Sequence, residues 1–248
     1  MNIQLLSDLH LEFYPDDGKR FVEGLDPTHV DVLVLAGDIS LVSGNRLRRA
    51  LEWFCAKYPQ VVFILGNHEF YRHGVDGVLE ATAEIAEALP NLHWLENSTV
   101  EIDGQRFVGS SLWFPDLPDG QNHSYARSLN DFRMILGFRE WVYGRNTESQ
   151  KFLEDTVQAG DVVVTHHIPT VEGVHPKWLS DVSGFGRFFL CQLPKEVLGR
   201  PRLWFYGHTH DSIAFEVGNC QFRCNPFGYY MREENPEFNK RLVFGGDE

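Results

Sequence analysis

Residues 61–69 read VVFILGNHE, and this stretch decides the class of fold. The apolar run Val61–Leu65 is rich in β-branched and aromatic residues, and it ends in the polar cluster Gly66-Asn67-His68-Glu69. A continuous apolar run of this length predicts a strand that is buried on both faces of its sheet. In open sheets of such strands, ligands bind beyond the carboxyl ends. The stretch therefore predicts a sheet covered on both sides, with polar side chains at one edge.

The same arrangement occurs four more times along the chain. The other apolar runs are Asn2–Ser7, Asp31–Ala36, Asp161–Thr165 and Arg202–Tyr206. The polar clusters that follow them are Asp8-Leu9-His10, Gly37-Asp38, His166-His167 and Gly207-His208-Thr209-His210. Five strands that present polar side chains at their carboxyl ends predict one shared site.

Helical patterns and hairpins separate these strands. Apolar residues three and four positions apart predict helices over Arg46–Tyr58, Val75–Leu89 and Thr147–Val157. Hairpin turns at Asp103-Gly104 and Gly218-Asn219 join the strands Val100–Ile102, Gln105–Val108, Ile213–Val217 and Gln221–Cys224. The alternation indicates an α/β architecture. No internal repeat or linker divides the sequence, so we expect one domain over residues 1–248.

The composition is that of an ordinary globular protein, with 43% hydrophobic residues in 248. No apolar run approaches the roughly 20 residues that span a bilayer. The first residues lack the basic and apolar regions of a signal peptide. The four cysteines form no C-x-x-C pair, and although Cys220 and Cys224 lie on one face of a predicted strand, no second Cys/His pair completes a zinc site. We therefore expect reduced thiols and a cytoplasmic protein without a membrane partner.

The charge balance narrows the class of partner. The formal net charge is −13, with 35 acidic and 22 basic residues. Such a surface repels phosphate backbones, so nucleic acid is disfavoured as a partner.

The polar clusters together supply a donor set typical of transition metals. In chain order the set is Asp8, His10, Asp38, Asn67, His68, His166, His208 and His210. Oxygen and imidazole donors without thiolate suit Mn, Fe or Zn better than Ca²⁺ or Mg²⁺ alone. With His68 left aside, the donors suffice for two ions, about 3.5–4 Å apart and bridged by one central carboxylate.

Each cluster alone has an ordinary structural explanation. Asp8-Leu9-His10 suits a surface turn, and Asp38 suits a helix cap. His208 and His210 alternate, so they would point to one side of an extended segment. It is the joint occurrence of all five clusters, each after a buried strand, that indicates a common site.

In this order the clusters resemble the calcineurin-like metallophosphoesterase superfamily, whose pattern runs D-x-H, G-D, G-N-H-[D/E], H and G-H-x-H. All five blocks are present between residues 8 and 210. The resemblance implies a four-layer α/β/β/α sandwich of two mixed sheets with helices outside. It also implies a phosphoesterase with two divalent or mixed-valence metal ions and a metal-activated hydroxide that attacks phosphorus.

The resemblance also implies roles for particular residues. The first metal would be held by Asp8, His10, Asp38 and His210. The second would be held by Asp38, Asn67, His166 and His208, with Asp38 as the bridge. His167 is the alternative ligand to His166, since both directly follow the fourth strand.

Two further residues of the third block are not expected to bind metal. The resemblance makes His68 the general acid that protonates the leaving group. The alternative is a histidine that orients Asn67 or the bridging oxygen. Glu69 is expected to fix the loop rather than to contact substrate.

Departures from the pattern bear on the substrate. The serine/threonine protein phosphatase branch has Asp-Arg-Gly after its Gly-Asp block and an arginine before Gly-Asn-His-Glu, whereas this chain has residues 39–44 (ISLVSG) and Leu65 there. Segments 109–113, 130–133 and 224–229 are similar to a small group of bacterial and phage phosphoesterases, which implies no substrate. We expect a small phosphomonoester, phosphodiester or nucleotide as substrate. The alternatives are a non-catalytic metal-binding scaffold, or a nuclease of the superfamily with a basic stripe at its site.

Aromatic and arginine residues near the blocks are candidate substrate contacts, because such a pair can hold a nucleobase and a phosphate. They are Tyr71, Arg72, His167, Trp178 and Arg187. For each of them alone, packing in the core or at the rim is the competing explanation.

Overall fold

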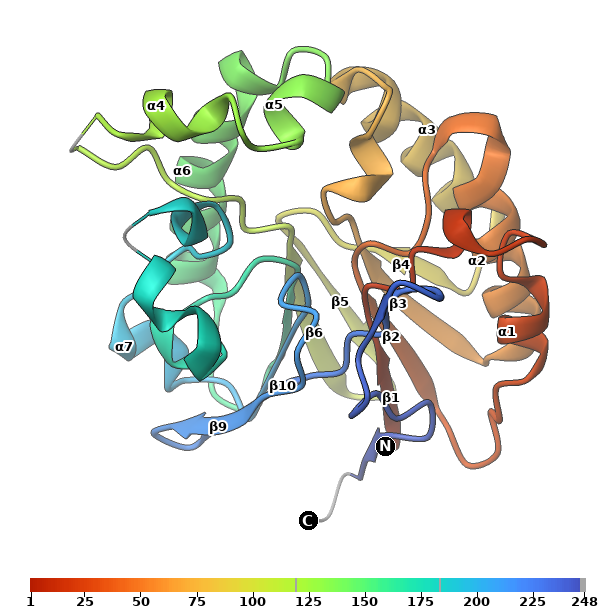
Figure 1. Ribbon diagram of the computed structural model, residues 1–248. Coiled ribbons are helices and arrows are strands. Elements are labelled where there is room, and N and C mark those ends of the chain that lie inside the picture. Colours follow the sequence, from red (N-terminus) through yellow and green to blue (C-terminus); the bar gives the residue numbers. More distant parts are fainter. Residues whose placement is uncertain (119, 183, 246–248) are drawn as a thin grey trace.

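The computed structural model of the protein describes residues 1–118, 120–182 and 184–245. Two sheets lie at the centre of the molecule, and the longer helices cover their outer sides (Figure 1). This arrangement confirms the expected sandwich of two mixed sheets flanked by helices.

The five-stranded sheet has the order β13-β1-β2-β3-β4, and all its neighbours are parallel except β13 against β1. Its strands are β1 (Ile3–Leu6), β2 (Val32–Ala36), β3 (Gln60–Ile64), β4 (Leu92–Trp94) and β13 (Val243–Phe244).

The six-stranded sheet has the order β5-β6-β7-β8-β10-β9, in which β5 and β9 are antiparallel to their neighbours. Its strands are β5 (Ser98–Ile102), β6 (Gln105–Ser110), β7 (Val162–Thr165), β8 (Leu203–Tyr206), β9 (Ala214–Val217) and β10 (Cys220–Cys224). A separate pair is formed by β11 (Gly228–Tyr229) and β12 (Glu233–Glu234).

Alternation along the central strands divides the apolar residues among three hydrophobic cores. In β2, Val32 and Val34 join a core with Val162 and Phe205 of the other sheet, while Leu33 packs toward the helices outside. Successive side chains of a strand point to opposite faces, so a strand that lies between two layers must be apolar throughout. This accounts for the continuous apolar runs of the sequence.

The helices lie against the two outer cores (Figure 1). They are α1 (Lys19–Glu23), α2 (Arg46–Lys57), α3 (Val75–Ala88), α4 (Asn122–Ala126), α5 (Asp131–Met134), α6 (Phe138–Thr156) and α7 (Lys195–Leu198). Short 3-10 turns are η1 (Leu11–Phe13), η2 (Ser43–Asn45), η3 (His68–Phe70), η4 (Val171–Gly173), η5 (Pro176–Asp181) and η6 (Phe185–Phe188). Within the described ranges, no helix combines the length and the apolar character needed to cross a membrane.

The predicted strands and hairpins are confirmed, with the ends of the five central strands within one residue of the predicted ends. One helix differs, because α6 begins at Phe138 and not at Thr147. Its inward face includes the polar residues Asn146 and Ser149, both buried, which interrupt the apolar periodicity. Asn146 donates a hydrogen bond to the carbonyl oxygen of Trp113, so this polar side chain is satisfied inside the protein.

Candidate metal centre

The polar clusters of the sequence converge at the carboxyl ends of β1, β2, β3, β7 and β8. These strands run parallel within their sheets, so their carboxyl ends meet at one edge of the sandwich. Three overlapping groups of donors form there, and in each group the donor atoms lie within 4.8 Å of one another. The groups are Asp8, His10 and His210; His10, Asp38 and His68; and Asp38, His166 and His208.

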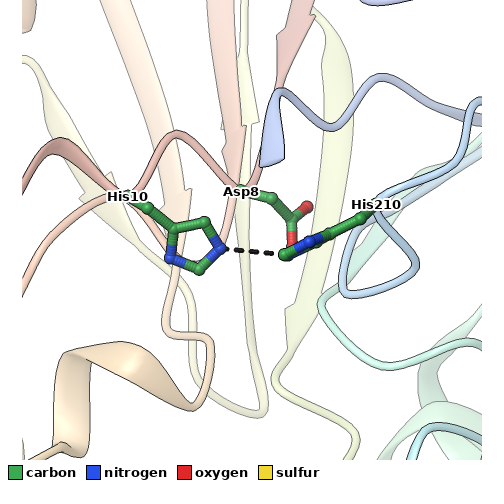
Figure 2. A group of neighbouring side chains, drawn as sticks. All are labelled: Asp8, His10 and His210. Carbon is green, nitrogen blue, oxygen red and sulfur yellow. Dashed lines mark hydrogen bonds and ion pairs between the residues drawn. The ribbon is translucent and has the colours of Figure 1, made fainter. Parts of the chain in front are cut away.

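The first group joins the segment after β1 to the segment after β8 (Figure 2). Nε2 of His10 lies 3.0 Å from Nε2 of His210, and Nε2 of His210 lies 3.6 Å from Oδ1 of Asp8. The backbone N–H of His208 donates to both carboxylate oxygens of Asp8, at 2.9 and 3.1 Å. Asp8 is thus held by the same segment that carries His210.

The group of Asp38, His166 and His208 lies at the strand ends of β2, β7 and β8, with Asn67 from the end of β3 beside it. Nε2 of His166 lies 3.1 Å from Nδ1 of His208 and 3.3 Å from Oδ1 of Asn67. The Asp38 carboxylate lies between His166 and His10, with Oδ1 3.5 Å from Nε2 of His166 and Oδ2 3.8 Å from Nε2 of His10, and it belongs to two of the three groups.

His166 and His167 point in different directions. Nδ1 of His166 lies 2.9 Å from the carbonyl oxygen of Ala36, so this nitrogen carries the proton and Nε2 offers its lone pair to the donor group. Nδ1 of His167 lies 3.0 Å from the carbonyl oxygen of Ser111, and its ring packs 4.7 Å from the ring of Trp113. His166 therefore belongs to the donor group, while His167 packs behind it, 4.4 Å from the ring of His208.

Left-handed backbone is concentrated in these donors. A positive φ is uncommon for residues other than glycine, although Asn, Asp and His adopt it more readily than most. The donors with positive φ are Asp8 (51°), His10 (44°), Asp38 (56°), His208 (67°) and His210 (52°). Such conformations persist where the surrounding structure fixes them, and they cluster at functional sites.

Three glycines allow the donor segments to approach one another. A Cβ at Gly37 would overlap the ring of His166, and a Cβ at Gly66 would overlap the carboxylate of Asp38. At Gly207, a Cβ would lie 2.7 Å from Oδ2 of Asp8. The glycine that precedes the polar residues in three of the five blocks is therefore a steric requirement of the donor cluster.

Burial controls the protonation of the donors. It raises the pKa of Asp8 to about 7, and that of Asp38 well above its ordinary value, where the charges of Glu69 and Asp8 add to the effect. Burial likewise lowers the pKa of His10 to about 3 and that of His210 to about 4.

His166 and His208 also have a pKa well below the ordinary range because of burial. Four neutral imidazoles with available lone pairs, beside two buried carboxylates, form a donor set that fits divalent transition metals. The residues at this edge therefore suit the metal site that the sequence predicts.

Two carboxylates behind the donors hold the loops in place. Glu69 is fully buried and accepts hydrogen bonds from the backbone N–H groups of Asp38, Ile39 and Gly66, at 3.1, 2.6 and 2.7 Å. Its role is the loop-fixing one expected from the sequence. Asp131 accepts from Nδ2 of Asn67 at 3.0 Å, which directs the amide oxygen of Asn67 toward His166.

His68 lies beside the donors, and two contacts of its ring were not anticipated from the sequence. Nδ1 lies 3.0 Å from Oε1 of Glu12, and Nε2 lies 3.3 Å from the hydroxyl of Tyr229. Burial would raise the pKa of Glu12, but the nearby imidazoles of His10 and His68 outweigh it and lower that pKa to about 2. Glu12 is therefore ionised, and Nδ1 of His68 must be the donor.

Sequence signals for these contacts are weak. Glu12 continues the alternation Asp8, His10, Glu12 after β1, and Tyr229 ends the segment 224–229 that resembles a group of phosphoesterases. The contacts join residues 56 and 161 positions apart, so no local pattern reveals them.

Two cavities meet at His68. One, of about 400 Å³, is lined by Asp38, Asn67, His208 and His210, and also by apolar side chains that include Trp178, Phe185 and Phe189. The other, of about 430 Å³, is lined by Arg46, Arg72 and Arg232. His68, Tyr71, Asn130 and Tyr229 line both.

The residues predicted to contact substrate lie in different places. Tyr71 lines both cavities, Trp178 lines the first and Arg72 lines the second. Arg187 is buried and donates to the carbonyl oxygen of Gly184 and to Oδ1 of Asn122, so it serves local structure.

Known proteins with similar sequences or folds include phosphoesterases. The profile of the calcineurin-like phosphoesterase family matches residues 1–212. Over 272 residues the chain is 25% identical to an uncharacterized protein of Acanthamoeba polyphaga mimivirus, which covers 94% of this chain and 93% of that protein. A transmembrane protein with a metallophosphoesterase domain from Danio rerio is 34% identical over 244 residues, covering 95% of this chain but 46% of that protein. The crystal structure of a phosphopantetheinyl hydrolase from Mycobacterium tuberculosis has a TM-score of 0.70 at 17% identity, covering 92% of this chain and 89% of that one, which shows a shared fold.

Proposed function

This chain belongs to the calcineurin-like phosphoesterase family, and from that premise we propose that it hydrolyses small phosphate esters with two divalent metal ions. One ion is held by Asp8, His10, Asp38 and His210. The other is held by Asp38, Asn67, His166 and His208. Metal ions at this position supply an activated water and neutralise charge on the phosphoryl oxygens.

The observation that supports this proposal most strongly is the position of Asp38. Its two carboxylate oxygens face imidazoles of different donor groups, at 3.5 and 3.8 Å. A carboxylate so placed can bridge two cations and reduce the repulsion between them. The backbone N–H of His68 donates to Oδ1 of Asp38 at 2.8 Å, which fixes the orientation of the bridge.

His68 is the proposed general acid. Its Nδ1 proton is committed to Glu12, so Nε2, in a ring that lines both cavities, is the nitrogen that can give a proton to a leaving oxygen. Tyr229 limits rotation of the ring from the other side, 3.3 Å from Nε2. The competing role, in which His68 only orients neighbouring groups, predicts no dependence on the leaving group.

The cavity beside the donors supports a small organic ester as substrate. Its volume of about 400 Å³ falls in the range of small-molecule sites, and its apolar lining suits an organic substituent on phosphorus. The net charge of −13 disfavours a nucleic-acid substrate. The four free cysteines are consistent with a reducing, cytoplasmic setting.

The test is hydrolysis of bis-p-nitrophenyl phosphate and p-nitrophenyl phosphate by metal-stripped protein, with and without added Mn²⁺, Fe²⁺ or Zn²⁺. We expect turnover that requires metal and is abolished by Asp38→Asn. The preferred substrate distinguishes diester from monoester chemistry, and the most active ion indicates the metal. Metal-independent turnover, or full activity of Asp38→Asn, contradicts the proposal. A folded protein that binds two ions and turns over neither substrate favours the scaffold alternative.

A further inference from the structure

The second cavity at His68 concentrates positive charge in an acidic protein. Arg46, Arg72 and Arg232 line this cavity of about 430 Å³, although the chain as a whole carries a net charge of −13. They come from the start of α2, from the segment after η3, and from the turn between β11 and β12. Three separate segments thus bring guanidinium groups to one place, which points to an anionic ligand.

Two of these guanidinium groups have no ion-pair partner among the residues that the structure describes. Arg46 is paired with Asp17, with Nε 3.0 Å from Oδ1. In the part of the chain that the structure describes, no carboxylate lies within ion-pair distance of Arg72 or Arg232, and Arg232 lies over the ring of Phe13 at 5.7 Å. The carboxylate in the cavity wall, Glu12, is hydrogen bonded to His68. Two unpaired guanidinium groups match the charge of a phosphate dianion better than that of a carboxylate.

The backbone at Arg72 is itself constrained. Its φ is 65°, in the left-handed region that long side chains rarely adopt. The backbone N–H of Arg72 donates to the carbonyl oxygen of Met134 at 2.8 Å and holds this conformation. Strained backbone that neighbouring structure fixes is typical of positions where side-chain placement matters for binding.

The position of the cavity relative to His68 connects it with the reaction. The metal donors line the first cavity, the arginines line the second, and His68 and Tyr229 belong to the wall of both. A leaving group that takes a proton from Nε2 of His68 can therefore extend into the arginine-lined cavity.

We propose that the leaving group of the substrate carries a second phosphoryl group, which binds in the cavity lined by Arg46, Arg72 and Arg232. This inference rests on the proposed function for the reacting phosphate. In the reaction, the oxygen of water forms a bond to phosphorus, and the P–O bond to the leaving alcohol breaks. The alcohol oxygen takes a proton from Nε2 of His68, whose Nδ1 proton stays hydrogen bonded to Glu12, and a proton released by the water returns to Nε2.

The test measures affinity, without turnover, in the metal-loaded full-length protein. Propane-1,3-bisphosphonate and its homologues with four to six carbons are compared with the matching alkyl monophosphonates by isothermal titration calorimetry. Their C–P bonds are not hydrolysed. Because charge-assisted hydrogen bonds to arginine contribute strongly, we expect one bisphosphonate to bind at least about tenfold more tightly than its monophosphonate.

Arginine variants identify the source of this preference. Arg72→Gln and Arg232→Gln should each reduce the ratio of the two affinities severalfold, and Arg72→Lys should restore part of it. The matched control is Arg20→Gln, because Arg20 is 92% exposed on α1, outside both cavities, and should leave the ratio unchanged. Arg232→Gln keeps the test decisive if Arg72→Gln fails to fold.

A ratio near one at every chain length, no binding of either ligand, or a ratio that survives both glutamine variants overturns the inference. These outcomes differ from failure of the proposed function, which the absence of metal-dependent turnover of the nitrophenyl esters reveals separately. A bisphosphonate preference that depends on Arg72 in a protein without such turnover supports the anion site and contradicts the hydrolase.

Discussion

The donor cluster and the arginine-lined cavity meet at His68 but are built in opposite ways. The donors are held by the ends of five strands and are fixed from behind by Glu69 and Asp131. The arginines project from loops and from the first turn of a helix, and Arg72 and Arg232 have exposed side chains without carboxylate partners in the described chain. The donors are therefore largely buried and supported from behind, whereas two of the three arginines are exposed.

This difference separates two kinds of specificity. A change in the framework of the donors should affect every substrate, because it moves the groups that act on phosphorus itself. A change in the arginines should affect only the discrimination between substrates that carry a second anionic group and those that do not.

The largest effect is expected at the carboxylate between the donor groups. Asp38→Asn should remove most of both ions and lower kcat/KM by at least about a hundredfold, since both groups depend on this side chain. Asp8→Asn should weaken mainly one ion, because Asp8 belongs to one group. Metal content by mass spectrometry, with kcat/KM from the nitrophenyl assay, measures both. Equal metal loss in the two variants would show that Asp38 is not the bridge.

The next largest effect is expected at His68. Replacement by alanine should keep the bound metal while lowering kcat about 10²–10⁴-fold for esters with poor leaving groups, and much less for nitrophenyl esters. Glu12→Gln should produce a weaker form of the same leaving-group dependence, because it replaces the charged acceptor of the Nδ1 proton with a neutral one. A series of aryl esters with leaving-group pKa from about 7 to 10 gives the dependence of log kcat on the leaving-group pKa for each variant. Uniform loss across the series would contradict general-acid catalysis.

A smaller effect is expected from one methyl group in the framework. Gly66→Ala places a Cβ against Asp38 and His166, so we expect a loss of roughly 1–3 kcal/mol in the free energy of unfolding, together with weaker metal binding. The matched control is Gly144→Ala, where a Cβ meets nothing within 4 Å and α6 should gain about 0.5–1 kcal/mol. Denaturant titration of both variants measures the contrast. A Gly66→Ala protein as stable as the wild type would show that the donor loops can separate.

The smallest effect is expected at the margin of the arginine-lined cavity. Burial raises the pKa of Asp17, but hydrogen bonds from Arg46 and Arg49 outweigh it, so the net shift is downward. A lowered pKa means that the ion pairs stabilise the fold at neutral pH and that this contribution is lost as pH falls through the folded-state value. Because the pairs are partly exposed, Asp17→Asn should cost less than about 1 kcal/mol at pH 7.

The same variant leaves Arg46 unpaired beside the cavity. Affinity for the bisphosphonate should therefore rise about two- to fivefold. The difference between the variant and the wild type in the free energy of unfolding should become smaller as the pH is lowered. Calorimetric titration and unfolding curves at pH 7 and pH 3 measure the two quantities. Weaker bisphosphonate binding by Asp17→Asn would argue that Asp17 positions Arg46 and that its charge is unimportant.

The sequence was sufficient for the elements that local periodicity defines. The central strands were predictable because both faces of each are apolar, and the donors because each follows such a strand. The start of α6 was not predictable, because Asn146 and Ser149 occupy its buried face and hide the helical period. Burial of these side chains depends on partners elsewhere, such as the carbonyl group of Trp113.

The surroundings of the donors were less accessible to sequence reasoning. The block Gly66-Asn67-His68-Glu69 predicted a loop-fixing glutamate, but it could not identify Asp131 as the residue that orients Asn67 from 64 positions away. Arg72 was a candidate phosphate contact, but Glu12, Arg46 and Arg232 were missed for the same reason. Their roles depend on side chains that are far apart in the sequence and close together in the fold. Local sequence patterns do not show which distant residues come into contact.

The hydrogen bonds of Glu69 have a kinetic consequence. One carboxylate binds amides from the loop after β2 and from the loop after β3, so neither loop can open without breaking bonds to the other. The amide protons of Asp38, Ile39 and Gly66 should therefore exchange with deuterium at a common rate, as one cooperative unit. The loops after β2 and β3 would then open together in a single event governed by the buried side chain of Glu69, and neither would open independently.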